Sequence, residues 1–140
     1  MSDVRRTLAI IKPDAFGSGL AGTILAHLED EGFRPVAARV HRLSRAEAKA
    51  FYAVHREKPF FGSLVEFMTS GRCMPVALER EDAVRKLREV IGATDPAEAE
   101  EGTVRALHAE SVERNAIHAS DSPENARKEL AFFFPETELL

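Results

Sequence analysis

Apolar and polar residues follow one another along this chain in blocks that predict strands and helices in turn. Residues 7–11 form a short apolar run, as expected for a buried strand. Apolar residues then recur at the i, i+3, i+4 and i+7 spacing of an amphipathic helix, at Ala21, Ile24, Leu25 and Leu28. Gly32 can close this helix, and the loosely alternating residues 33–43, which include β-branched valines, predict a second strand.

The middle of the chain carries a helix start signal and then another strand and helix. Residues 44–47 have the S-x-x-E form of a capping box and open a helix that reaches about Val54. A short helix is predicted over residues 64–68 and a third strand over residues 73–78. Residues 84–91 place their apolar side chains on one face, which predicts a further helix.

The last third of the chain begins with a segment that has little pattern. Residues 92–111 are rich in Gly, Ala, Glu and Asp, and a structureless loop of that length is often functional. A short strand is predicted to end at His118. Ser122 as N-cap and Pro123 at the first helical position then start the last helix.

The order β-α-β-(αα)-β-α-β-α predicts an α/β sandwich in which helices pack on a single sheet. The simplest arrangement is ferredoxin-like, βαββαβ with a four-stranded antiparallel sheet, in one domain spanning residues 1–140. Pro75 conflicts with this topology, because a proline inside an internal strand removes a ladder donor. A bulge or a shorter strand would resolve the conflict, and the sequence leaves both open.

Composition narrows the class of protein. Of 140 residues, 44% are hydrophobic and 30% charged, as in a soluble globular protein, and the net charge of −4 does not favour nucleic-acid or acidic-membrane binding. A single cysteine, Cys73, excludes an internal disulfide and fits a reducing compartment. No stretch approaches the length of about 18 apolar residues that a membrane span needs, and no signal peptide is recognisable. We therefore expect a cytoplasmic protein.

A glycine-rich segment suggests a dinucleotide site, but its context argues against one. Residues 17–22 read G-x-G-x-x-G, yet residues 12–16 separate them from the preceding strand, so the tight turn is misplaced. The second strand ends in His41-Arg42-Leu43, without an acid to hold a ribose. No G-x-x-x-x-G-K-[ST] phosphate loop is present either. Phosphate binding would therefore need side-chain cations, for which Lys12, Arg88 and Arg105 are candidates, although each alone could be a surface charge.

His118 is the candidate nucleophile. A neutral imidazole has a free lone pair near pH 7 and can accept a phosphoryl group when a partner on its other nitrogen fixes the tautomer. Glu129 on the following helix could fold back to supply that partner, and Ser120 could orient the carboxylate. The competing interpretation is a structural histidine at a strand end. The other histidines form no zinc spacing with Cys73, so no protein metal site is predicted.

Taken together, these segments resemble the nucleoside diphosphate kinase family over nearly the whole chain. The stretches "KPDA", "KPFFGSLVEFMTSG", "GATDPAEAEEGTVRA" and "NAIHASDSPENARKE" are similar to the family's signature segments in order and spacing. The resemblance implies ping-pong transfer of the γ-phosphate of a nucleoside triphosphate, mainly ATP, through Nδ1 of His118 to a nucleoside diphosphate. Glu129 and Ser120 match the residues that hold the other ring nitrogen, and Tyr52 matches an aromatic hydroxyl near the transferred group.

The resemblance also implies the nucleotide contacts. Lys12, Arg88 and Arg105 match cationic phosphate ligands, Thr94 a hydroxyl contact to phosphate, Phe60 the ring that stacks on the base, and Asn115 the sugar 3′-hydroxyl contact. Mg²⁺ would be held by phosphate oxygens and waters rather than by the protein. Family members are homo-oligomers, and a chain that ends at Leu140 lacks the longer tail of many hexamers, which favours a tetramer.

Several positions depart from the family pattern. Ala119 replaces a glycine after the catalytic histidine, which would cost about 1 kcal/mol or more if the position needs a positive φ. Leu107, His108, Val54 and Arg72 also differ from the usual residues. These changes motivate one alternative, a catalytically silent nucleotide-binding or scaffold subunit. A second alternative, a histidine phosphorelay protein, would have no use for a base-and-sugar site.

Overall fold

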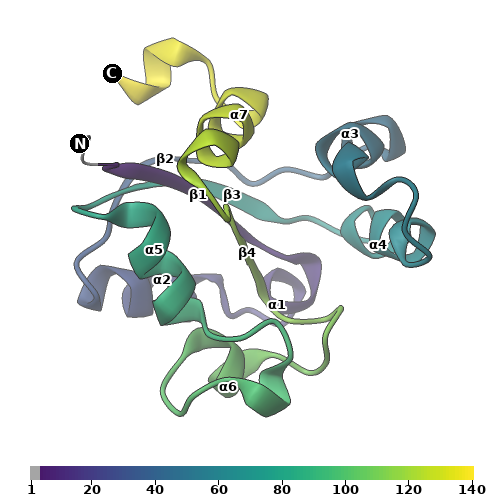
Figure 1. Ribbon diagram of the computed structural model, residues 1–140, viewed down its shortest axis with the longest axis horizontal. Helices are drawn as coiled ribbons and strands as arrows, with labels where there is room; N and C mark the ends of the chain where they lie inside the picture. The colour runs from purple at the N-terminus through teal and green to yellow at the C-terminus, as the bar shows by residue number, and fades with distance from the viewer. Residues whose placement is uncertain (1–3) are drawn as a thin grey trace.

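The computed structural model describes residues 4–140 and contains one four-stranded antiparallel sheet with helices on both faces (Figure 1). The strands lie in the order β2-β3-β1-β4 and span Arg6–Ile11 (β1), Arg34–Ala38 (β2), Met74–Glu79 (β3) and Ile117–Ala119 (β4). The α-helices span Pro13–Gly17 (α1), Ala21–Asp30 (α2), Arg45–Phe51 (α3), Phe61–Met68 (α4), Ala83–Ile91 (α5), Val104–His108 (α6) and Pro123–Phe133 (α7). Short 3₁₀ helices span Ala53–His55, Pro96–Glu98 and Glu136–Leu139. The predicted ferredoxin-like fold is confirmed.

The central strand β1 explains why its sequence is apolar throughout. Leu8 and Ile10 face a core formed with α3, α4 and α7, whereas Ala9 and Ile11 face a second core formed with α2 and α5. All four side chains are completely buried. Successive side chains of a strand point to opposite faces, so a strand covered on both faces needs apolar residues at every position. Figure 1 shows these two helical layers on either side of the sheet.

Capping residues set the start of several helices as predicted. The Ser44 hydroxyl accepts a hydrogen bond from the Glu47 amide, and the Glu47 carboxylate accepts one from the Ser44 amide, so the capping box is complete. The Ser122 hydroxyl accepts from the Asn125 amide, and Pro123 occupies the first turn of α7.

Two predictions about the elements are wrong, and one helix was not predicted. Residues 13–17, to which the sequence analysis assigned no element, form α1, because Pro13 at the first helical position presets φ and needs no hydrogen-bond partner. The segment 92–111 is not structureless, because α6 lies within it and the Thr103 hydroxyl caps it. The second strand ends at Ala38 and not at residue 43.

The early end of β2 also accommodates Pro75. The Arg39 amide donates to the Pro75 carbonyl at 3.1 Å, so the main chain of Pro75 faces β2, and its missing N–H would point the same way. The regular ladder has already stopped at Ala38, and pairing resumes only at an isolated bridge between His41 and Cys73. The third strand stays regular opposite β1, whereas its ladder with β2 shifts register between Pro35 and Ala37 and stops before Pro75.

Gly92, directly after α5, tolerates no side chain. Its φ is +91°, and an added Cβ would lie 2.5 Å from the Thr103 hydroxyl oxygen. We expect Gly92→Ala to lower the free energy of unfolding by about 2–4 kcal/mol through backbone strain and overpacking. Urea unfolding followed by circular dichroism measures this difference.

Gly22→Ala is the matched control. Gly22 lies in α2, and no heavy atom lies within 4 Å of an added Cβ. Alanine there is expected to stabilise the protein by about 0.5–1 kcal/mol, because it restricts the unfolded chain and favours the helix. Equal unfolding midpoints for the two variants would contradict the role assigned to Gly92.

Candidate active site

A cavity of about 600 Å³ opens beside the end of β1 and β4. It collects side chains from α3, α5, α6, α7 and the loops at residues 52–60 and 92–115. Every predicted site residue except one lines it: Lys12, Tyr52, Phe60, Arg88, Thr94, Arg105, Asn115, His118 and Glu129. The exception, Ser120, is completely buried behind Glu129.

The geometry around His118 orients its ring. Its Nε2 lies 2.8 Å from Oε1 of Glu129, and the Ser120 hydroxyl donates to the same oxygen at 2.7 Å. A carboxylate only accepts, so Nε2 carries the hydrogen and Nδ1 keeps its lone pair. Among residues 4–140, no hydrogen-bond partner contacts Nδ1. The ring is therefore held in the tautomer that leaves Nδ1 nucleophilic.

Aromatic side chains enclose the imidazole. Phe51, which the sequence did not single out, meets the His118 ring edge-on at 5.4 Å, and Tyr52 does so at 6.2 Å. The Tyr52 hydroxyl is buried without a hydrogen-bond partner in the described chain, and burial raises its pKa above the ordinary value. Tyr52 therefore keeps its proton and offers a donor beside His118.

Two buried cations, Lys12 and Arg105, also line the cavity. Lys12 is 7% exposed, and its Nζ donates to Oδ1 of Asn115 at 2.8 Å. Arg105 is 5% exposed and donates to the carbonyls of Gly92 at 3.1 Å and Ile117 at 2.7 Å. These bonds tie the segment from residue 92 to α6 onto β4.

The electrostatics of these cations favour an anionic ligand. Burial, with a further contribution from Arg105, lowers the pKa of Lys12 to about 8. Burial and then Arg88 lower the pKa of Arg105 to about 10. Buried like charges destabilise one another, and a bound polyanion would relieve both the repulsion and the lost hydration.

The outer end of the cavity is suited to a flat ring and a sugar. Phe60 is 46% exposed at the start of α4, and the exposed Val112 lines the same cavity from the loop after α6. Farther in, the Asn115 side-chain amide donates to the Thr94 carbonyl at 3.2 Å, which joins the 92–115 segment to the Lys12 end.

Ala119 carries no backbone strain. Among non-glycine residues in the 4–140 range, only Asp82 and Ala116 have a positive φ. Ala119 lies in β4 opposite Ala9, and its side chain belongs to the core cluster shared with α2 and α5. The alanine is therefore compatible with an ordinary strand, and this departure gives no reason to expect a silent protein.

The other departures lie outside the cation and histidine clusters. Leu107 and Val54 are exposed, and Val54 lines the outer part of the cavity. Arg72 is also exposed, and His108 is half-buried. Burial and the nearby His27 lower the pKa of His108. None of these positions supplies a contact to His118, Lys12 or Arg105 in the bonds described above.

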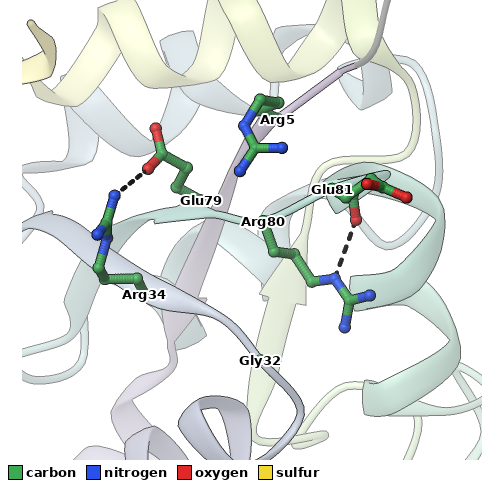
Figure 2. Close-up of a pocket in the computed structure, with 6 residues that line it drawn as sticks. All are labelled: Arg5, Gly32, Arg34, Glu79, Arg80 and Glu81. Carbon is green, nitrogen blue, oxygen red and sulfur yellow. Dashed lines mark hydrogen bonds and ion pairs between the residues drawn. The ribbon is translucent and has the colours of Figure 1, made fainter.

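A second hollow of about 430 Å³ lies at the opposite end of the sheet, where β1 begins and β3 ends (Figure 2). Two of its arginines bind residues that also line it: Arg34 pairs with Glu79 at 2.6 Å, and Nε of Arg80 donates to the Glu81 carbonyl at 2.9 Å. Its lining contains no histidine, thiol or hydroxyl. This hollow therefore offers no imidazole comparable to that of His118 in the first cavity.

Two further features concern metals and membranes. Within residues 4–140, no group of three or more His, Cys, Asp and Glu side chains is arranged to hold a metal ion. In the same range, every helix falls short of the length and apolarity that crossing a membrane requires.

Comparison with known proteins agrees with this arrangement. A family model described as nucleoside diphosphate kinase matches residues 5–139. Nucleoside diphosphate kinases of Nitrosospira multiformis and Burkholderia thailandensis are each 56% identical over 133 residues, which is 95% of this chain and 94% of theirs. A crystal structure of the Aquifex aeolicus nucleoside diphosphate kinase superposes with a TM-score of 0.93 at 47% identity, covering 96% of this chain and 97% of that one. By sequence over almost its whole length and by fold, the chain belongs to the nucleoside diphosphate kinase family and is a nucleotide phosphotransferase.

Proposed function

We propose that Nδ1 of His118 carries the phosphoryl group between a nucleoside triphosphate, mainly ATP, and a nucleoside diphosphate. The observation that supports this most strongly is the chain of contacts from Ser120 to Glu129 to Nε2, which leaves the other ring nitrogen without a hydrogen-bond partner among residues 4–140. A structural histidine at a strand end would not need a carboxylate that is itself oriented by a buried hydroxyl.

The transfer has two symmetric halves. Nδ1 attacks the γ-phosphorus, an N–P bond forms, and the bond from that phosphorus to the β–γ bridging oxygen breaks, so a nucleoside diphosphate leaves. The imidazole becomes positively charged, and the carboxylate of Glu129 on Nε2–H stabilises that charge. A terminal phosphate oxygen of a second diphosphate then attacks the phosphorus and displaces Nδ1.

Side-chain cations supply most of the remaining catalysis. Phosphoryl transfer depends mainly on in-line positioning and on stabilising charge on the equatorial oxygens. Lys12, Arg88 and Arg105 line the same cavity as His118 and supply that charge. The hydroxyl of Tyr52 donates to the transferred group, and that of Thr94 to a phosphate.

The base and sugar contacts follow from the outer cavity. The exposed ring of Phe60 stacks on the base, and stacking tolerates every base because each has a π-face. Asn115 and Lys12, already bonded to each other, bind the sugar 3′-hydroxyl. This site would accept many nucleotides, as an enzyme that equilibrates nucleotide pools requires.

The family requires a divalent metal, and we infer that this metal is Mg²⁺. Oxygen-rich phosphates and waters are the ligands that Mg²⁺ prefers, and it commonly binds through substrate phosphates instead of a protein cage. When bound it neutralises phosphate charge. The protein's contribution is to hold the metal-bound nucleotide through Lys12, Arg88 and Arg105.

We also propose the setting in which the enzyme works. The chain forms one domain over residues 1–140 and assembles as a homo-oligomer, with a tetramer favoured over a hexamer. It acts in the cytoplasm, which the buried free thiol of Cys73 supports. Native mass spectrometry distinguishes the two assemblies.

Intact-mass spectrometry tests the reaction. After brief mixing with Mg·ATP, each chain is expected to gain one phosphoryl group, and a chase with GDP is expected to remove it. A protein that binds ATP but never gains this mass would overturn the proposed function.

A further inference from the structure

Asp14 is a buried carboxylate next to the active site but outside the side chains that line it. It lies in α1, is 8% exposed, and accepts a hydrogen bond through Oδ2 from the amide of Ala116 at 3.0 Å. Its other oxygen, Oδ1, is buried without a partner in the described chain. Such an arrangement costs desolvation, so the carboxylate needs a reason to be there.

Its partner, Ala116, has an unusual backbone. Its φ is +75°, in the left-handed region that costs a non-glycine residue roughly 1–2 kcal/mol. Both of its main-chain polar groups are bonded to the β1–α1 junction, because its carbonyl accepts from the Lys12 amide at 2.9 Å. Asp14 and Lys12 together hold this strained residue in place.

The strained residue sits between two site residues. Asn115 precedes it and bonds through its side chain to Nζ of Lys12 at 2.8 Å and to the Thr94 carbonyl at 3.2 Å. His118 follows two residues later in β4. A change in the Ala116 backbone would therefore rotate Asn115 away from Lys12.

Asp14 also acts on Lys12 through its charge. The charged groups that face Lys12 are Arg105 from α6, Asp14 from α1 and Glu113 from the loop after α6. Burial and then Arg105 disfavour the charged ammonium and lower the pKa of Lys12 to about 8. Asp14 and then Glu113 act in the opposite direction and favour the charged form. Of the two carboxylates that favour the charged form of Lys12, Asp14 has the larger effect.

We propose that Asp14 is a positioning residue for the sugar- and phosphate-binding end of the site: its carboxylate anchors the Asn115–Ala116 turn and keeps the Lys12 ammonium charged. This proposal rests on the proposed function, since it assumes that Lys12 and Asn115 bind the nucleotide. It assigns Asp14 no contact with substrate.

Two substitutions separate the hydrogen bond from the charge. Asp14→Asn keeps an oxygen that can accept from the Ala116 amide and removes the charge, whereas Asp14→Ala removes both. Thr7→Val is the matched control, because Thr7 is completely buried in β1 and its hydroxyl, like Oδ1 of Asp14, has no partner in residues 4–140. KM for GDP and kcat are measured for all variants between about pH 6 and pH 9, which spans the Lys12 pKa of about 8.

For Asp14→Ala we expect KM to rise about tenfold at pH 7, as for loss of a buried charged hydrogen bond, with a smaller change in kcat. Asp14→Asn is expected to keep a KM near that of the wild type at pH 7. Its KM should then rise at a lower pH than in the wild type, because an ammonium without the nearby carboxylate loses its proton sooner. Thr7→Val should match the wild type throughout.

The outcomes distinguish this proposal from the function on which it rests. If the wild type forms no phosphohistidine, the proposed function fails. If the wild type does form it, a folded Asp14→Ala protein with an unchanged KM overturns the positioning role alone, even if its melting temperature falls. Should Asp14→Ala not fold, the Asn variant decides: a pH dependence of KM identical to that of the wild type overturns the proposal.

Discussion

Replacing His118 by alanine is expected to lower turnover by at least about 10⁴-fold and to abolish the phosphorylated enzyme, because the other histidine that lines the cavity, His55, has no carboxylate on its ring among residues 4–140. Tyr52 keeps its proton, and burial removes its nucleophilicity. The alanine variant should still bind nucleotide, since Lys12, Phe60 and Arg105 are unchanged. Turnover by a coupled ATP and GDP assay and intact mass after mixing with Mg·ATP measure the two effects.

His27→Ala is the control for this experiment. His27 lies in α2 and does not line the cavity, so its loss should leave both turnover and the phosphorylated mass unchanged. A mass gain that persists in the His118 variant and disappears in the His27 variant would place the phosphoryl group elsewhere and contradict the mechanism.

Replacing Lys12 by methionine is expected to lower kcat/KM by about 100-fold or more without lowering the melting temperature. The loss of activity follows from the proposed role of Lys12 as a fixed charge beside the transferred phosphoryl group. The melting temperature is expected to hold because removing the buried charge stabilises the fold, whereas losing the bond to Asn115 destabilises it by a similar amount. Lowering the Lys12 pKa from 10.5 to about 8 means that the buried charge costs about 3 kcal/mol. Leaving the Asn115 oxygen without a donor costs about 1–3 kcal/mol.

The pH dependence of stability tests the same residue. Between pH 8 and 10.5 the unfolded chain binds a proton at Lys12 that the folded chain has released. The free energy of unfolding therefore gains a contribution that rises with pH across this window, and Lys12→Met should lack it. Lys49→Met, at an exposed site on α3, is the control and should keep both activity and the pH dependence. If Lys12→Met unfolds at a much lower temperature, Lys12 is structural and not a strained functional cation.

The elements that could be predicted are those whose signals are local. The apolar run of β1, the capping box of α3 and the Ser122 cap of α7 depend on neighbouring residues only, and each appears where the sequence places it. Helix α6 could not be predicted from periodicity, because five residues give barely more than one turn. The end of β2 depends on Pro75 in β3, and the alternation of apolar and polar residues within 33–43 carries no information about that residue.

In the site, too, the residues could be predicted from local sequence, whereas the contacts between them could not. Most of the predicted site residues lie within the segments that carry the resemblance, whereas Tyr52 and Arg88 lie outside the quoted stretches. The contacts among them are tertiary: Lys12 bonds to a residue 103 positions later, and Arg105 to carbonyls on two separate elements. Phe51 and Asp14 were not singled out, because Phe51 fits a residue that packs its helix on the core and Asp14 lies in a segment for which no element was predicted.

The strand order has a consequence for synthesis on the ribosome. β1 is made first, yet both strands that pair with it, β3 and β4, come much later in the chain. At roughly 5–20 residues per second, this apolar strand waits several seconds before its first partner is translated. During that time it is an unpaired, aggregation-prone segment, so production of active enzyme depends on how well the growing chain is shielded until the last strand and helix emerge.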